Sequence, residues 1–151
     1  MNIIDKFKGN YFFLSNFANA PVFYKGVTYK NNEAAFQAQK VLSISEQQKF
    51  ASLPPNLAKR EGRRVKLRPD WELIKKQVMY EIVKAKFEQN PGLRKMLLNT
   101  GDAMLVEGNT WHDNTWGVCT CDKCISKCHI DFNNLGKILM KVREELKHAI
   151  N

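Results

Sequence analysis

All four cysteines of the chain lie between residues 119 and 128, and two of its three histidines lie close by. Their spacing is C-x-C-x2-C-x3-C, and His112 precedes the run. Tetrahedral zinc takes four thiolate or imidazole ligands, and a C-x2-C turn supplies two of them. One interpretation is a structural zinc, with no open position for catalysis; reduced cysteines lining a packed loop are the other. The candidate ligands are Cys119, Cys121, Cys124 and Cys128, with His112 able to close the site from outside.

The charge of the chain indicates anionic partners. It has 151 residues, with 24 basic and 15 acidic side chains and a net charge of +9. Such a balance favours nucleic acids, nucleotides or phosphosugars. The N-terminus lacks a basic region followed by a long apolar run, and no apolar stretch is long enough to span a membrane. We therefore expect a cytoplasmic protein without a membrane partner, in which thiols stay reduced.

Hydrophobic patterns along the chain predict the elements that position the candidate residues. They predict one domain, residues 1–151, of the α+β class, which is mostly helical with a small β-hairpin. Residues 22–24 and 27–29 are short aromatic and β-branched runs around Lys25-Gly26, which is typical of a hairpin. Asn32 is the predicted N-cap of a helix that begins at Glu33. In that helix Glu33, Gln37 and Lys40 share one face.

The remaining elements follow from helical periodicity and from breakers. Asp70 is the predicted cap of a long helix with a buried stripe of Trp71, Ile74, Val78, Ile82 and Ala85. The expected elements are helices at 46–53, 56–64, 71–87, 93–100 and 134–149, a short strand at 104–107, and a long loop at 108–132.

Seven stretches, taken together and in order, resemble the NADAR family, the YbiA-like proteins. Any one of them is a weak signal, but in register they cover nearly the whole chain. They are FLSNF (13–17), Y-x3-EAAFQAQK (29–40), AKREGRRVKLRPDW (58–71), KFEQNPGLRKMLLNTGD (86–102), LVEGN (105–109), DNTWG (113–117) and NNLGKILMKVREEL (133–146). The cysteines occupy a loop where the simplest family pattern has a short glycine-rich connector.

The resemblance implies a compact, helix-rich α+β domain that cleaves the bond between a ribose and a nitrogen base. Two substrate classes are implied: phosphoribosyl-amino-pyrimidine intermediates of riboflavin synthesis, and ADP-ribose attached to guanine in nucleic acid. It also implies catalysis that requires no cofactor, since the family chemistry needs no metal.

This chemistry calls for a carboxylate near C1′, because the bond breaks through a sugar that resembles an oxocarbenium ion. Glu33, on a family motif position, is the first candidate, and Asp113 is the second. A lysine could bind phosphate, or could trap the open-chain aldehyde as a Schiff base. Lys40 and Lys86 are the candidates. Each of the four has an ordinary structural alternative: a helix-end charge, a turn cap, or a solvated lysine.

Four further residues are candidates for substrate binding. Trp116 could stack on a base, and Asn133 could contact ribose hydroxyls or phosphate at the start of the last helix. Glu107 ends the predicted strand, and Asn16 lies in FLSNF; a salt bridge and a turn are their structural alternatives. A competing function is a non-enzymatic, zinc-stabilised basic module that binds nucleic acid.

Overall fold

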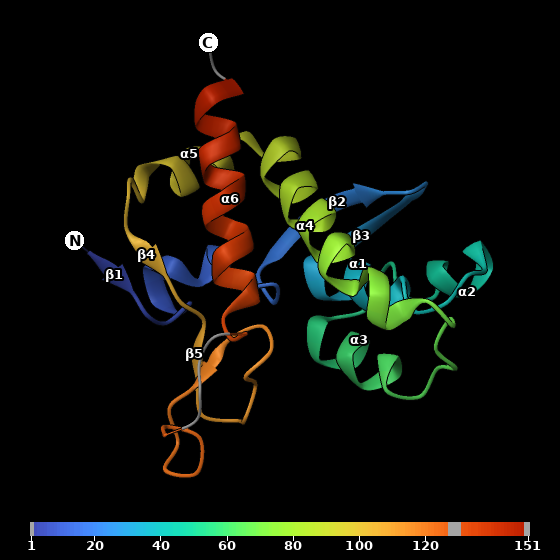
Figure 1. The fold of residues 1–151 in the computed structure, drawn as a ribbon. Coiled ribbons are helices and arrows are strands. Elements are labelled where there is room, and N and C mark those ends of the chain that lie inside the picture. Colours follow the sequence, from blue (N-terminus) through green and yellow to red (C-terminus); the bar gives the residue numbers. More distant parts are fainter. Residues whose placement is uncertain (1, 127–130, 150–151) are drawn as a thin grey trace. The chain divides into compact units, whose positions relative to one another are not determined.

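The computed structural model of the protein describes residues 2–126 and 131–149, and the chain forms two compact units (Figure 1). The inserted unit is Asn16–Arg94, and the terminal unit is Met1–Ser15 with Lys95–Asn151. Helices dominate and the sheets are small, which confirms the predicted α+β class. That the two units form a single domain stays a prediction. None of the described helices is long and apolar enough to cross a membrane.

The inserted unit begins with the predicted hairpin, formed by β2 (Asn19–Tyr24) and β3 (Val27–Asn31). Burial alternates along both strands, so one face packs against the core. Lys25 and Gly26 both have positive φ, as a two-residue hairpin turn of type I′ requires. The hairpin prediction is confirmed, although both strands extend beyond the predicted residues.

Helix α1 (Asn32–Ala38) is buried on every side: all seven of its residues are buried. It packs against α3, both strands of the hairpin and α4. The helix is capped by Asn31, whose side-chain oxygen accepts from Ala34 N at 2.7 Å. The predicted N-cap, Asn32, is therefore one residue too late in the chain. Its buried side chain is free for a different role because Asn31, the last residue of β3, already has the extended backbone that a cap needs.

Three more helices complete the inserted unit: α2 (Ile44–Gln48), α3 (Pro55–Gly62) and α4 (Trp71–Gln89). On α4, Trp71, Val78 and Ile82 are buried as predicted, whereas Ile74 and Ala85 are only partly buried. A second buried row exists because α4 packs against both β2 and α1; it consists of Met79, Val83, Lys86 and Phe87. The Asp70 side chain makes no cap hydrogen bond, because it pairs with Arg68 Nε at 2.6 Å.

The terminal unit is assembled from both ends of the chain. Its strands are β1 (Ile3–Ile4), β4 (Met104–Leu105), β5 (Gly108–Asn109) and β6 (Val118–Cys119); its helices are η1 (Gly9–Leu14, a 3-10 helix) and α6 (Asn134–Ala149), and α5 (Pro91–Asn99) leads into it. β1 pairs with β4, and β5 pairs with β6, both in parallel. The α6 bounds confirm the prediction. The predicted 108–132 loop, in contrast, contains the β5–β6 pair.

Candidate functional site

The polar residues of α1 form a buried cluster in the inserted unit. Glu33 is only 8% exposed, and its Oε2 accepts a hydrogen bond from Gln37 Nε2 at 2.7 Å. The Glu33 backbone N–H donates to Asn16 O at 3.1 Å. Burying a carboxylate costs free energy unless it is paired or hydrogen-bonded, and carboxylates kept in such positions are common at functional sites. Glu33 therefore has a fixed, largely water-excluded position.

Asn16 and Asn32 extend this cluster. Asn32 Nδ2 donates to Asn16 Oδ1 at 3.3 Å, and Asn16 Nδ2 lies 3.5 Å from Met79 Sδ on α4. The predicted site residue Asn16 thus links its own segment to both α1 and α4. Asn32 was not identified from the sequence as a member of this cluster, because it was assigned to the N-cap of the helix.

Two acceptor atoms in the cluster have no hydrogen-bond partner among the described residues: Asn32 Oδ1 and Gln37 Oε1. A buried acceptor left unpaired costs free energy, and such atoms often mark the place of a ligand or water donor. Gln37 Oε1 lies against Gly62, where an added Cβ would stand 1.9 Å from it. Gly62 is therefore a packing requirement of the cluster. The sequence indicated only that Gly62 lies near a helix end, and it gave no sign of this packing requirement.

Lys40 lies close to the same cluster. Its Nζ donates to Gly62 O at 3.3 Å. Burial lowers the pKa of the Lys40 amine, Glu33 opposes this shift, and the nearby cations Arg63 and Lys75 add to it. The structure thus brings Asn16, Glu33 and Lys40 together.

Lys86 is a fully buried cation of the inserted unit: it is 1% exposed and lies in the last turn of α4. Its Nζ lies 5.1 Å from the centre of the Phe87 ring. Burial lowers the pKa of Lys86 to about 7. An amine with such a pKa is partly neutral near pH 7, and a neutral amine is nucleophilic.

In the terminal unit, Asn133 connects the strand β4 segment to the start of α6. Its Oδ1 accepts from Glu107 N at 3.0 Å, and its Nδ2 donates to Leu105 O at 2.9 Å. Its backbone is left-handed, with φ of 61°, and its N–H donates to Gly117 O at 3.0 Å. Asn133 and Glu107 are thus adjacent. The Asn133 amide positions the backbone, and substrate contact by either residue stays a prediction.

Asp113 and Trp116 share a turn. Asp113 Oδ1 accepts from Thr115 N at 3.0 Å and from Trp116 N at 2.9 Å, so the carboxylate fixes the turn. The buried Asn109, which the sequence did not single out, accepts from Asp113 N at 3.2 Å and donates to Asp113 O at 2.9 Å. Both predicted residues are partly buried, and the segment that holds them is well organised. Their predicted roles in catalysis and base stacking remain predictions.

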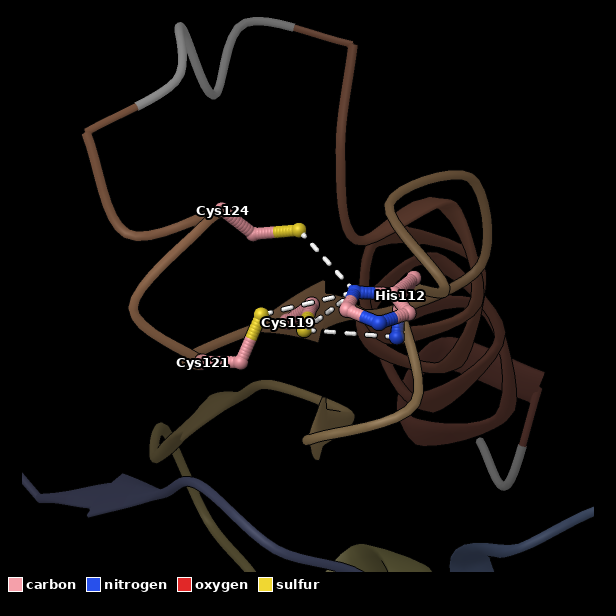
Figure 2. Close-up of side chains that lie close together, drawn as sticks. All are labelled: His112, Cys119, Cys121 and Cys124. Atoms are coloured by element: carbon pink, nitrogen blue, oxygen red, sulfur yellow. Dashed lines mark hydrogen bonds between the residues drawn. The ribbon is translucent and has the colours of Figure 1, made fainter.

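A cluster of thiols and one imidazole occupies the segment beside this turn (Figure 2). The ligand atoms of His112, Cys119, Cys121 and Cys124 all lie within 4.8 Å of one another, so these residues could hold a metal ion. His112 Nδ1 is 3.5 Å from the sulfur of Cys124, 3.4 Å from that of Cys121 and 3.9 Å from that of Cys119. Three of the four predicted cysteine ligands thus meet; Cys128 lies outside the described residues.

The inserted unit therefore holds the buried Glu33 carboxylate and two lysines, Lys40 and Lys86, whose pKa values are lowered. A carboxylate and an amine are groups that can serve in the cleavage of a glycosidic bond. Comparison with known proteins bears on this chemistry. Residues 5–147 match the family model of the NADAR domain. The N-glycosidase YbiA of Escherichia coli is 42% identical over 135 residues, which cover 87% of this chain and 79% of that protein.

Two other relatives and one solved structure are also similar to this chain over most of its length. An N-glycosidase of Nostoc punctiforme is 35% identical over 143 residues, covering 91% of this chain and 86% of that protein. A riboflavin biosynthesis protein of Vibrio vulnificus is 37% identical over 144 residues, 93% of this chain but only 37% of that protein. The NMR structure of Escherichia coli YbiA matches with a TM-score of 0.82 and 36% identity, covering 99% of this chain and 87% of that one.

Proposed function

This chain belongs to the NADAR family and is a hydrolase of N-glycosyl bonds, and we propose that it cleaves the bond between ribose C1′ and the nitrogen of a ribosylated base. The observation that carries the proposal is the buried Glu33 carboxylate, oriented by Gln37 in the α1 cluster. As the C1′–N bond breaks, positive charge grows on the sugar, and a fixed carboxylate stabilises it. Water then adds to C1′ and its proton goes to the departing nitrogen, which gives the free base nitrogen and the hydroxylated sugar, ADP-ribose or ribose 5-phosphate according to the substrate.

Lys86 supplies a second route to the same products. Because its pKa is about 7, its amine can attack C1′ of the ribosylated base, and the base leaves from C1′ with a proton. The resulting Lys–C1′ adduct opens its ring at O4′ to give a Schiff base, and water hydrolyses this Schiff base to restore the amine and release the sugar as an aldehyde. Lys40, beside the α1 cluster, is suited to binding a substrate phosphate.

The substrate we favour is ADP-ribose attached to guanine in a nucleic acid. The support is the net charge of +9, because a nucleic-acid strand offers many phosphates to a basic protein. A phosphoribosyl-amino-pyrimidine intermediate is the second candidate. It is favoured by the relative named as a riboflavin biosynthesis protein. The cytoplasm is the proposed location, and no metal takes part in the proposed chemistry.

Glu33→Gln tests the proposal, with Glu46→Gln as the matched control. Glu46 is also a glutamate in the first turn of a short helix of the inserted unit, but it is exposed. The variants are incubated with ADP-ribosylated guanosine in DNA and, separately, with the phosphoribosyl compounds. Mass spectrometry follows the ADP-ribose released from the DNA and the base released from the phosphoribosyl compounds. Glu33→Gln should nearly abolish release with little change in Tm, whereas Glu46→Gln should leave it unchanged.

Two outcomes count against this function. Equal turnover by wild type and Glu33→Gln removes Glu33 from the site. If wild type releases neither ADP-ribose from the DNA nor base from the phosphoribosyl compounds, but binds nucleic acid, and EDTA abolishes that binding, the zinc-stabilised binding module is the better interpretation.

A further inference from the structure

We propose that His112, Cys119, Cys121 and Cys124 bind one structural zinc ion, and that this ion holds in place the segment that carries Asp113 and Trp116. The zinc site itself does not depend on the proposed reaction. Only its consequence for substrate handling rests on the proposed function.

The distances from the His112 ring nitrogen to the three sulfurs are close to those of a tetrahedral site, and all four ligand atoms lie within 4.8 Å of one another. With Zn–S bonds of about 2.3 Å and a Zn–N bond of about 2.0–2.1 Å, a regular tetrahedron has N···S edges of about 3.6 Å and S···S edges of about 3.8 Å. The observed distances from His112 Nδ1 to the three sulfurs are 3.4, 3.5 and 3.9 Å. Figure 2 shows the three sulfurs grouped around Nδ1 of the imidazole. Three thiolates and an imidazole are a ligand set that zinc prefers.

The backbone presents the cysteines as a metal knuckle does. Cys121 O accepts hydrogen bonds from Cys124 N and Ile125 N, each at 3.0 Å, which closes the tight turn of the C-x2-C pair. Cys119 lies on β6 and is fully buried, and Cys124 is 3% exposed. Two of the thiols are thus shielded from water in a part of the chain where little else is buried.

His112 shows two further features of a ligand. Its backbone has φ of 69°, a left-handed conformation that a histidine adopts at a cost. Its backbone N–H donates to the sulfur of Cys119 at 3.3 Å, the kind of bond that stabilises a metal-bound thiolate. The strained backbone therefore directs both the ring and the amide of one residue toward the thiols.

All four positions of the tetrahedron are filled by side chains, so the ion has no open position for water and is structural. The positions of its ligands along the chain indicate which segment the ion would hold in place. His112 and Cys119 are the two ends of an eight-residue span that contains Asp113, Trp116 and the Asp113 turn. Backbone hydrogen bonds from the start of α6 to residues 115–117 hold the middle of this span. Its two ends depend on the two-residue strands β5 and β6, which contribute little stability, and the ion would tie these ends together.

The zinc content of the purified full-length protein tests the site. Mass spectrometry of the metal should find about one zinc per chain after dialysis against metal-free buffer. Cobalt(II) added to the metal-depleted protein should give the visible bands of tetrahedral coordination and the near-ultraviolet thiolate charge-transfer band. Less than one-tenth of a zinc per chain together with octahedral cobalt would overturn the proposal, whether or not the protein releases base from any substrate.

Single substitutions test the ligand set. Cys121→Ser and His112→Ala should each raise the Kd for zinc by more than the 10- to 100-fold that loss of a ligand-orienting group costs. Two controls match them. Cys128→Ser should leave the Kd within about twofold, and so should replacement by alanine of the exposed His148, which bonds only Glu144 among its described contacts. If Cys128→Ser releases zinc and His112→Ala does not, the assignment of His112 is wrong.

The consequence for the segment has its own readout. The fluorescence of Trp116, isolated by replacing Trp71 and Trp111 with phenylalanine, should shift toward that of exposed tryptophan when zinc is removed, and should return when zinc is restored. A spectrum that does not respond to zinc in a protein that demonstrably binds it would refute the positioning role while leaving the site intact.

Discussion

Replacement of Lys86 by methionine is the most direct test of the buried amine on α4. Burial lowers the pKa of Lys86 from 10.5 to about 7. Below pH 7 the folded and unfolded states both hold the proton, so this group gives no pH dependence there. Between pH 7 and about 10.5 only the unfolded state is protonated. The free energy of unfolding must therefore rise with pH across this window.

The size of this effect follows from the lowering of the Lys86 pKa. Each pH unit in the window is worth about 1.4 kcal/mol. From pH 6 to pH 9 about two units fall inside it, so wild type should gain about 2.7 kcal/mol of stability from this group. Methionine is unbranched, apolar and of similar length, so Lys86→Met should keep the packing and lose this gain.

Urea unfolding at pH 6, 7, 8 and 9 measures the difference. The stability of wild type relative to Lys86→Met should increase with pH, while Lys76→Met, on the exposed face of the same helix, should run parallel to wild type. If Lys86→Met also runs parallel to wild type, the amine is not neutral in the folded protein near pH 8. The amine route proposed for catalysis then fails with it, since that route needs the unprotonated form.

Two further predictions concern packing. Gly62→Ala should destabilise the protein by about 1–3 kcal/mol and slow base release, because the new methyl group displaces Gln37 from Glu33. Gly92→Ala is the control: it meets no atom within 4 Å, lies in a helix, and should stabilise by about 0.5–1 kcal/mol in urea unfolding. Asn133→Ala should lower stability by about 2–4 kcal/mol, since it removes two hydrogen bonds and places alanine at positive φ. Asn133→Gly, which tolerates that φ, should lose less; equal losses would show that backbone strain has no part in the effect.

The sequence predicted best the elements whose signal is local. The apolar stripe of α6 and the Lys25-Gly26 turn carry their own periodicity and turn chemistry, so both were located correctly. The cap of α1 was displaced by one residue because Asn31 and Asn32 are equally good cap residues, and only the end of β3 decides between them. The two-residue strands β5 and β6 have no periodic pattern at all, and their pairing exists only in three dimensions.

The candidate site was predictable in its residue types but not in its connections. Glu33 and Gln37 follow from helical spacing along one face of α1, whereas Lys40, which was predicted on the same face, lies in the turn after the helix ends at Ala38. Gln37 contacts Gly62 because α1 packs on α3, and this packing could not be predicted from the sequence. The zinc ligands show the same limit: spacing favoured the four cysteines equally, whereas folding brings His112 from outside the run to three of them.

The parallel pairing of Ile3 with Met104 has a consequence for how the chain reaches its folded state. On the ribosome, the inserted unit is a continuous segment and can form as soon as residue 94 has emerged. The terminal unit forms later, because among the described strands β1 pairs with β4, and α6 follows β4 in the chain. Contacts of such long sequence separation form slowly. We therefore expect the terminal unit to acquire its structure after the inserted unit, so that Asn133 and the thiol cluster become ordered later than the α1 helix and its neighbours.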